Sequence, residues 1–141
     1  MRHQKAYKAL GRGPAHRKAM IRNLLTSLVE HERIETTHTR CKMLKREADK
    51  LITLGKRGSL HHKRLVAEVL FRKDLVTKLF DELTPRFKDR NGGYTRIIPR
   101  GFRRGDAAPV SIIEFVGAPE VAVAKAAPEA AKKPGSTESE E

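Results

Sequence analysis

Residues 92–116 read GGYTRIIPRGFRRGDAAPVSIIEFV, and this stretch decides which kind of fold the chain can adopt. Two segments in it, 94–100 (YTRIIPR) and 110–116 (VSIIEFV), have the density of β-branched and aromatic residues that is typical of strands. The tripeptide at 91–93 (NGG) supplies a turn before the first segment, and GFRRGDAAP joins the two. The stretch therefore predicts two strands connected by a glycine-containing loop.

The chain before this stretch is patterned mainly as helices. Apolar residues at helical spacing predict a helix that begins at Pro14, a second over about 39–56, a third capped by Ser59, and a fourth capped by Asp74 that Pro85 ends or bends. The segment RIETT (33–37) has the composition of a short strand. The order α-β-α-α-α-β-β predicts a two-layer α+β fold, with a small three-stranded mixed sheet packed on helices.

Each predicted helix has one apolar face that we expect to be buried. These faces consist of Ile21, Leu24, Leu25, Leu28 and Val29 in the first helix; Cys41, Leu44, Ala48, Leu51, Ile52 and Gly55 in the second; Leu65, Val66, Val69 and Leu70 in the third; and Val76, Leu79, Phe80 and Leu83 in the fourth.

Composition divides the 141 residues into one domain and two extensions. Residues 1–13 lack an apolar period, so we expect a basic N-terminal extension, followed by a single α+β domain over 14–117. Residues 118–141 are rich in Ala, Pro, Lys, Glu and Ser, and we expect a disordered tail.

The chain carries 30 Lys and Arg against 17 Asp and Glu, a net charge of +13. Such an excess opposes compaction and indicates a polyanionic partner.

Basic residues gather in three candidate RNA-contacting regions. Residues 1–29 contain seven Lys and Arg and no acid, so they favour phosphate contact over a merely solvated terminus. At 59–64 (SLHHKR) cations would occupy the first turn of a helix, where the dipole is already positive; docked phosphate or simple solvation would both accommodate them. The third region is the predicted hairpin. The candidates are Arg2, His3, Lys5, Lys8, Arg12, His16, Arg17, Lys18, Arg22, His61, His62, Lys63, Arg64, Tyr94, Arg96, Arg100, Phe102, Arg103 and Arg104.

Within the hairpin, alternation predicts Tyr94, Arg96, Ile98 and Arg100 on one face of the strand. The rings of Tyr94 and Phe102 can stack on unpaired bases or pack at the sheet edge, and the sequence leaves both open. The tripeptide RGD (104–106) occurs without any secretory signal, so we interpret it as a loop in which Asp106 braces the turn.

Enzymatic chemistry is not indicated. The six histidines have no partnered nucleophile at a recognisable spacing, and the carboxylates are dispersed. One cysteine, Cys41, excludes an intrachain disulfide and fits a reducing, cytoplasmic setting. Adjacent His61 and His62 diverge on a helix, which argues against a metal site. No segment has the length of a membrane span. We expect no cofactor, no small-molecule substrate and no independent homo-oligomer.

Six segments, in order, resemble the bacterial-type large-subunit ribosomal protein L17 family. They are MRH (1–3), HRKAMIRNLLTSLVEHERIETT (16–37), KLITLGK (50–56), LFDELTPRF (79–87), GGYTRI (92–97) and RGDAAPVSIIEF (104–115). The resemblance implies a structural constituent of the large subunit that binds 23S rRNA near the exit of the peptide tunnel, beside other large-subunit proteins. It implies an α+β fold and no catalytic residue or metal. A free nucleic-acid-binding regulator is the alternative that charge alone would allow.

Overall fold

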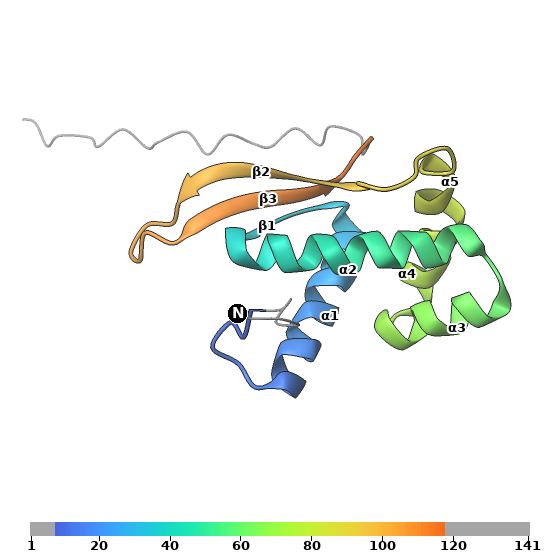
Figure 1. Cartoon of the computed structure of the whole chain (residues 1–141), viewed down its shortest axis with the longest axis horizontal. Coiled ribbons are helices and arrows are strands. Elements are labelled where there is room, and N and C mark those ends of the chain that lie inside the picture. Colours follow the sequence, from blue (N-terminus) through green and yellow to red (C-terminus); the bar gives the residue numbers. More distant parts are fainter. Residues whose placement is uncertain (1–7, 118–141) are drawn as a thin grey trace, which may run out of the picture.

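The computed structural model describes residues 8–117 (Figure 1). Its elements follow the predicted order, with the fourth helix divided into three consecutive segments. They are α1 (Pro14–His31), β1 (Arg33–Thr37), α2 (His38–Arg57), α3 (Leu60–Val69), α4 (Lys73–Lys78), the π-helical turn η1 (Leu79–Leu83), α5 (Thr84–Arg86), β2 (Thr95–Phe102) and β3 (Pro109–Phe115).

The three strands form one sheet in the order β1-β3-β2. Both outer strands run antiparallel to β3, so Ile113 lies opposite Ile34 on one side and Ile97 on the other. The prediction of a mixed sheet is therefore wrong. Strands β1 and β2 do run in the same direction, but β3 is inserted between them, and no parallel pair forms within residues 8–117.

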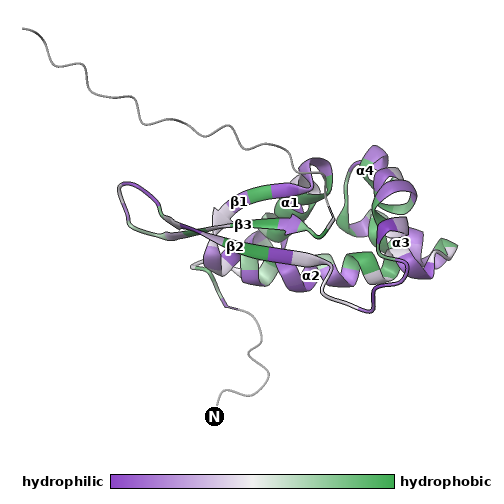
Figure 2. Ribbon diagram, turned by 90° about the horizontal axis from the view of Figure 1, so that it is seen from above, coloured by the Kyte–Doolittle hydropathy of each residue, from purple (hydrophilic) through white to green (hydrophobic). Residues whose placement is uncertain are grey.

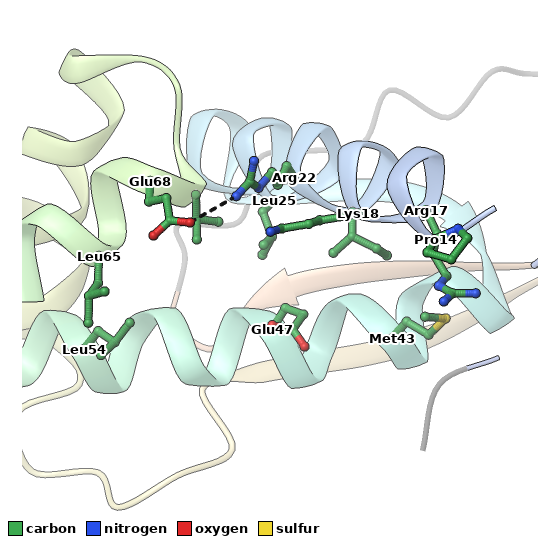
Figure 3. A pocket seen from close by; sticks show the side chains of 12 residues that line it. Pro14, Arg17, Lys18, Arg22, Leu25, Met43, Glu47, Leu54, Leu65 and Glu68 are labelled. Carbon is green, nitrogen blue, oxygen red and sulfur yellow. Dashed lines mark ion pairs between the residues drawn. The ribbon is translucent and has the colours of Figure 1, made fainter. Parts of the chain in front are cut away.

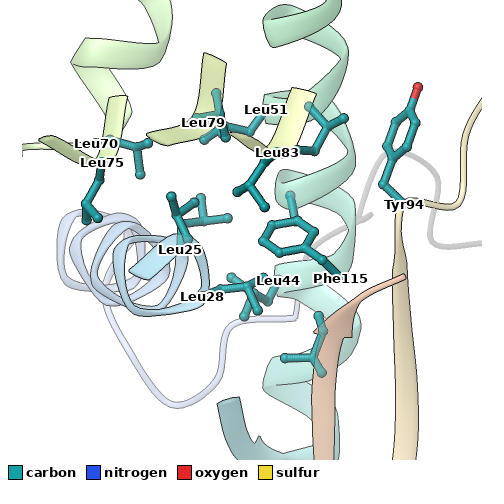
Figure 4. Packing of buried hydrophobic residues seen from close by; sticks show 14 of the residues in the cluster. Leu25, Leu28, Leu44, Leu51, Leu70, Leu75, Leu79, Leu83, Tyr94 and Phe115 are labelled. Carbon is teal, nitrogen blue, oxygen red and sulfur yellow. The ribbon is translucent and has the colours of Figure 1, made fainter. Parts of the chain in front are cut away.

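Helices cover one face of this sheet, and within residues 8–117 no helix covers the other, which we call the open face (Figures 1 and 2). Helix α2 runs along the sheet and contacts all three strands as well as α1, α3 and the η1–α5 segment. The core fills the space between these elements (Figure 4). At one end of it the rings of Phe87, Tyr94 and Phe115 pack together, with centroids 5.3 Å apart for the first pair and 6.2 Å for Phe87 and Phe115.

The predicted apolar faces are largely the ones that the core uses. All six residues predicted for the second helix are buried, and Met43 joins them. In α1 four of five are buried, while Leu24 is partly exposed. In the last helical segment Leu79 and Leu83 are buried, but Leu75 takes the place expected for Val76. The buried residues Leu75, Leu79 and Leu83 are thus four positions apart. This spacing fits a segment that contains a π-helical turn, which has more residues per turn than an α-helix.

The start and the end of the fourth helix differ from the prediction. Its N-cap is Arg72, and Asp74 lies inside the first turn, where its carboxylate accepts a hydrogen bond from the Arg72 guanidinium at 2.6 Å. Pro85 bends the helix without ending it. The N–H and hydroxyl of Thr84 both donate to the Leu79 carbonyl, the hydroxyl at 2.7 Å. This wider turn lets the chain accommodate a proline that has no N–H to donate.

Glu32 fixes the passage from α1 into the sheet. Its backbone is left-handed, with φ of 59°, which turns the chain sharply out of the helix. Its carbonyl accepts the Phe115 N–H at 3.1 Å, and its carboxylate accepts two hydrogen bonds from Arg86, at 2.5 and 3.0 Å. Lys78 lies 3.5 Å from the same carboxylate. One residue thus ties α1, β3 and the α4–α5 segment together.

Gly55 sets how closely α2 approaches Thr84. A Cβ at this position would lie 2.5 Å from the Thr84 hydroxyl oxygen, which is held by its bond to Leu79. Overpacking of this kind costs about 1–3 kcal/mol, and the better helix propensity of alanine returns up to about 1 kcal/mol. We expect Gly55→Ala to lower the free energy of unfolding by about 1–2 kcal/mol in urea titrations. Adding Thr84→Ala should recover part of that loss; a Gly55→Ala protein as stable as the wild type would contradict this packing.

The Glu32 carboxylate should make folding stability depend on pH. Hydrogen bonds from Arg86 lower its pKa from the ordinary value, with further lowering by the charges of Arg86 and Lys78, against an opposing effect of burial. A carboxyl with a lowered pKa stabilises the fold above its unfolded pKa, about 4.3, and loses that stabilisation as pH falls through the folded value. We expect Glu32→Gln to cost about 1–2 kcal/mol at pH 7. The difference from wild type should shrink below about pH 4, whereas Asp81→Asn, at an exposed carboxylate, should show neither effect.

Candidate nucleic-acid interface

The first group of cations lies in the first half of α1. Lys18 is exposed and Arg17 is half-buried, and both lie three or four residues before buried Ile21, on the side of the helix that faces α2. Arg12, just before the helix, lies with its guanidinium 2.8 Å from the His16 imidazole. Arg22 has one distant carboxylate, Glu68, at 3.7 Å. Of the predicted residues of this region, Arg17, Lys18 and Arg22 are brought together at the groove described next, and Lys8 is exposed. Arg2, His3 and Lys5 lie outside the described residues.

A groove of about 500 Å³ runs between α1, α2 and α3 beside these cations (Figure 3). Its walls are partly apolar, with Leu25, Leu54 and Leu65 among them. Arg17, Lys18 and Arg22 line it, and so do the carboxylates of Glu47 and Glu68. The groove thus mixes apolar surface with both signs of charge.

The second group lies at the start of α3, as predicted. The Ser59 side chain caps the helix by accepting the His62 N–H at 3.5 Å, and the His62 imidazole lies 2.6 Å from the same hydroxyl. No acidic residue occupies the first turn. Lys63 lies over the Phe80 ring at 5.4 Å, and His61 is exposed. This end of the helix is therefore positive from both its side chains and its dipole.

The third group lies on the open face of the sheet, where the arginines have acidic neighbours. Glu114 is only 8% exposed and accepts hydrogen bonds from Arg96, the shorter at 2.6 Å, with Arg33 at 3.4 Å on its other side. Arg100 pairs with Glu35 of β1. The Arg96 side chain is still 61% exposed. These arginines reach solvent as predicted, but part of their charge is balanced within the sheet.

A β-bulge changes the predicted alternation at Arg100. Pro99 pairs with Ser111 and Gly101 with Val110, so Arg100 is an extra residue with no partner across the strand. Gly101 has φ of 129°, a conformation that glycine adopts far more readily than other residues.

At the hairpin tip Asp106 holds the loop, as predicted. Its carboxylate accepts two hydrogen bonds from Arg103, at 2.5 and 3.0 Å, and one from the Ala108 N–H at 3.3 Å. The Arg103 guanidinium, followed by that N–H, lowers the pKa of Asp106 to about 2. Arg104 is exposed, and none of the residues the structure describes forms an ion pair with it. The RGD segment is thus a braced turn.

Tyr94 and Phe102, the two predicted stacking rings, have opposite environments. Phe102 is 77% exposed near the hairpin tip. Tyr94 is 4% exposed, precedes β2, and packs edge-on against Phe87. Its ring is therefore not available for base stacking, and the packing alternative is the one observed. The physical reason is the turn at 91–93, which directs residue 94 into the core before the strand begins.

Arg40 is a further candidate, which the sequence alone did not indicate. It lies in the first turn of α2 and lines a recess of about 480 Å³ together with Arg100, Phe102 and Arg103. No local signal marks it, because the recess joins residues that are some 60 positions apart in the chain. Lys42, also on α2, is exposed as well.

Residues 8–117 contain no arrangement typical of a metal site, a catalytic thiol or a membrane span. Nowhere in this part do three or more His, Cys, Asp or Glu side chains gather as metal ligands would. Burial raises the pKa of the Cys41 thiol, which is the opposite of what a nucleophile requires. Among the helices of this range, none combines the length and the apolarity needed to cross a bilayer.

Comparison with known proteins gives a consistent family. The family model described as ribosomal protein L17 matches residues 20–116. A relative named large ribosomal subunit protein bL17, from Moorella thermoacetica, is 57% identical over 111 residues, which cover 79% of this chain and 99% of the relative. Relatives of the same name from Pelobacter propionicus and Geobacter metallireducens are 55% and 56% identical over 116 residues, covering 82% of this chain and 91% and 65% of theirs. The chain therefore belongs to the ribosomal protein L17 family, whose members are structural and non-enzymatic constituents of the ribosome.

Proposed function

We propose that this protein is a structural constituent of the large ribosomal subunit that binds and stabilises folded 23S rRNA. The observation that carries the proposal is the placement of unbalanced cations. Lys18 on α1, Arg64 on α3 and Arg104 at the hairpin tip are all exposed, and the described residues offer none of them an ion pair. They lie on three separate elements, so one folded RNA surface that contacts them all would bridge the domain.

The family names of the relatives support the subunit assignment, since each is called a large ribosomal subunit protein. We also propose a position near the exit of the peptide tunnel and contacts with neighbouring large-subunit proteins, which the resemblance in sequence implies. The candidate contacts are the described residues of the three cationic regions, Tyr94 excepted, together with Arg2, His3 and Lys5 of the N-terminal extension.

Sedimentation tests the subunit assignment. We expect the protein in a cell lysate to migrate with large subunits through a sucrose gradient at moderate salt and to be released only at high salt, because phosphate contacts weaken as salt rises. A chain found mainly in the free fractions at physiological salt would contradict the proposal.

Removing the unbalanced cations tests the RNA contacts. We expect the triple variant Lys18→Gln, Arg64→Gln and Arg104→Gln to bind purified 23S rRNA more weakly than wild type. Each lost phosphate contact should reduce the slope of log K against log salt by about 0.7 to 0.9, so the three together should reduce it by about 2 to 3. Filter binding between low and moderate salt measures both quantities.

A matched variant separates position from total charge. Lys73→Gln, Lys88→Gln and Arg90→Gln also remove three exposed cations, but from surfaces outside the candidate set. We expect its slope to stay close to that of wild type. Equal losses in the two triple variants would mean that net charge, and not this interface, determines binding. Reversal of Arg96 is less suitable for this test because it would place a second carboxylate against buried Glu114.

A further inference from the structure

The recess beside the hairpin loop has features that general phosphate binding does not require. It lies where the β1–α2 junction meets the bulged end of β2 and has a volume of about 480 Å³. This volume is within the range of small-ligand sites, about 300–1,000 Å³. Arg40, Arg100, Arg103, Phe102 and Glu35 line it, and the bulge at Gly101 forms one wall.

The charges around the recess favour an anion on one side. Three arginines line it against one carboxylate, Glu35, which Arg100 already neutralises. Arg103 shares its charge with Asp106. Arg40 is the remaining arginine, and within residues 8–117 it has no ion pair. A phosphate entering the recess would therefore find an available guanidinium at Arg40.

The aromatic side of the recess is unusual in its exposure. Phe102 is 77% exposed, and in the described part of the chain no aromatic ring or cation packs on its face. An exposed ring beside a cationic recess suits a base, because every base offers a π-face and stacking needs no particular sequence. Bases in a duplex are already stacked, and the deep, narrow major groove of A-form RNA does not admit side chains to their edges.

We propose that this recess holds one unpaired nucleotide of RNA, with its base stacked on Phe102 and its phosphate at Arg40. This inference rests on the RNA binding proposed above and adds the class of RNA that the hairpin recognises. The cations of α1 and α3 bind the backbone of folded RNA, whereas the hairpin recess selects a nucleotide that is displaced from a helix.

The chain contains no tryptophan, so Phe102→Trp introduces a single reporter at the proposed contact. The test uses the full-length protein and two fluorescein-labelled RNAs: a single strand of roughly eight nucleotides and a blunt duplex of about twelve base pairs. Phe71→Trp and Phe71→Ala are the matched controls, because Phe71 is 65% exposed in the α3–α4 connection and does not line the recess. Circular dichroism spectra check that each variant is folded.

We expect Phe102→Ala to weaken binding of the single strand by about 5- to 100-fold, the range that loss of one base–aromatic stack predicts, while duplex affinity changes less than about twofold. Unlabelled single-stranded RNA should quench the tryptophan emission of the Phe102→Trp protein in a saturable way and leave that of the Phe71→Trp protein unchanged. If Phe102→Ala lowered the affinity for both RNAs equally, or if the RNA quenched the two tryptophan variants equally, the stacking contact would be overturned.

Arg40→Gln in the Phe102→Trp protein tests the phosphate contact. The salt slope for single-stranded RNA should fall by about 0.7, with quenching at saturation retained. An unchanged slope would overturn the assignment of the phosphate to Arg40. The outcomes that would overturn the recess can be told apart from those that would overturn RNA binding itself. If wild-type protein bound neither probe nor 23S rRNA, RNA binding itself would be wrong; if it bound both probes but Phe102→Ala had no effect, only the recess would be wrong.

Discussion

The buried face of α2 is the constraint on which the rest of the structure depends. This helix contacts the three strands, α1, α3 and the η1–α5 segment, so its seven buried residues must satisfy both layers of the fold. Gly55 lies where α2 meets Thr84, and there is no room for a side chain at that contact. Because nearly all apolar surface is used around α2, the Lys and Arg side chains are left on the faces that point outward.

That division explains how a chain with a net charge of +13 folds around a modest core. Some cations are neutralised within the structure: Arg86 and Lys78 at Glu32, Arg72 at Asp74 and Glu30, and Arg33 and Arg96 at Glu114. Apart from the local pair of Arg72 with Asp74, these pairs join elements to each other and have a structural role. Within residues 8–117, the exposed cations without such partners include Lys18 on α1, Arg64 on α3 and Arg104 on the hairpin, where a polyanion can approach them.

On the open face of the sheet, residues with a structural role lie next to candidate RNA-binding residues. Glu114 is nearly buried on this face because Arg33 and Arg96 cover it. A buried carboxylate that lost its partners would be costly, so these two arginines cannot be given over entirely to RNA. The hairpin extends past this layer, and there Phe102 and Arg104 have no comparable structural role. Along the hairpin, the arginines beside Glu114 therefore have a structural role, and the residues beyond that layer are available for binding.

Local sequence patterns were enough to predict the order of elements, the strand at 33–37, the buried faces of α1 and α2, and the cap at Ser59. These follow from local periods and from residues within four positions of each other, which a short segment contains completely. Tertiary structure alone decided that β3 lies between β1 and β2, that the Tyr94 ring is buried, and that Arg40 meets Phe102 in a recess. It also decided that Glu35 and Glu114 balance Arg100 and Arg96, pairs separated by 65 and 18 positions. Such contacts depend on strand register and on the bulge at residue 100, and neither is encoded in any one segment.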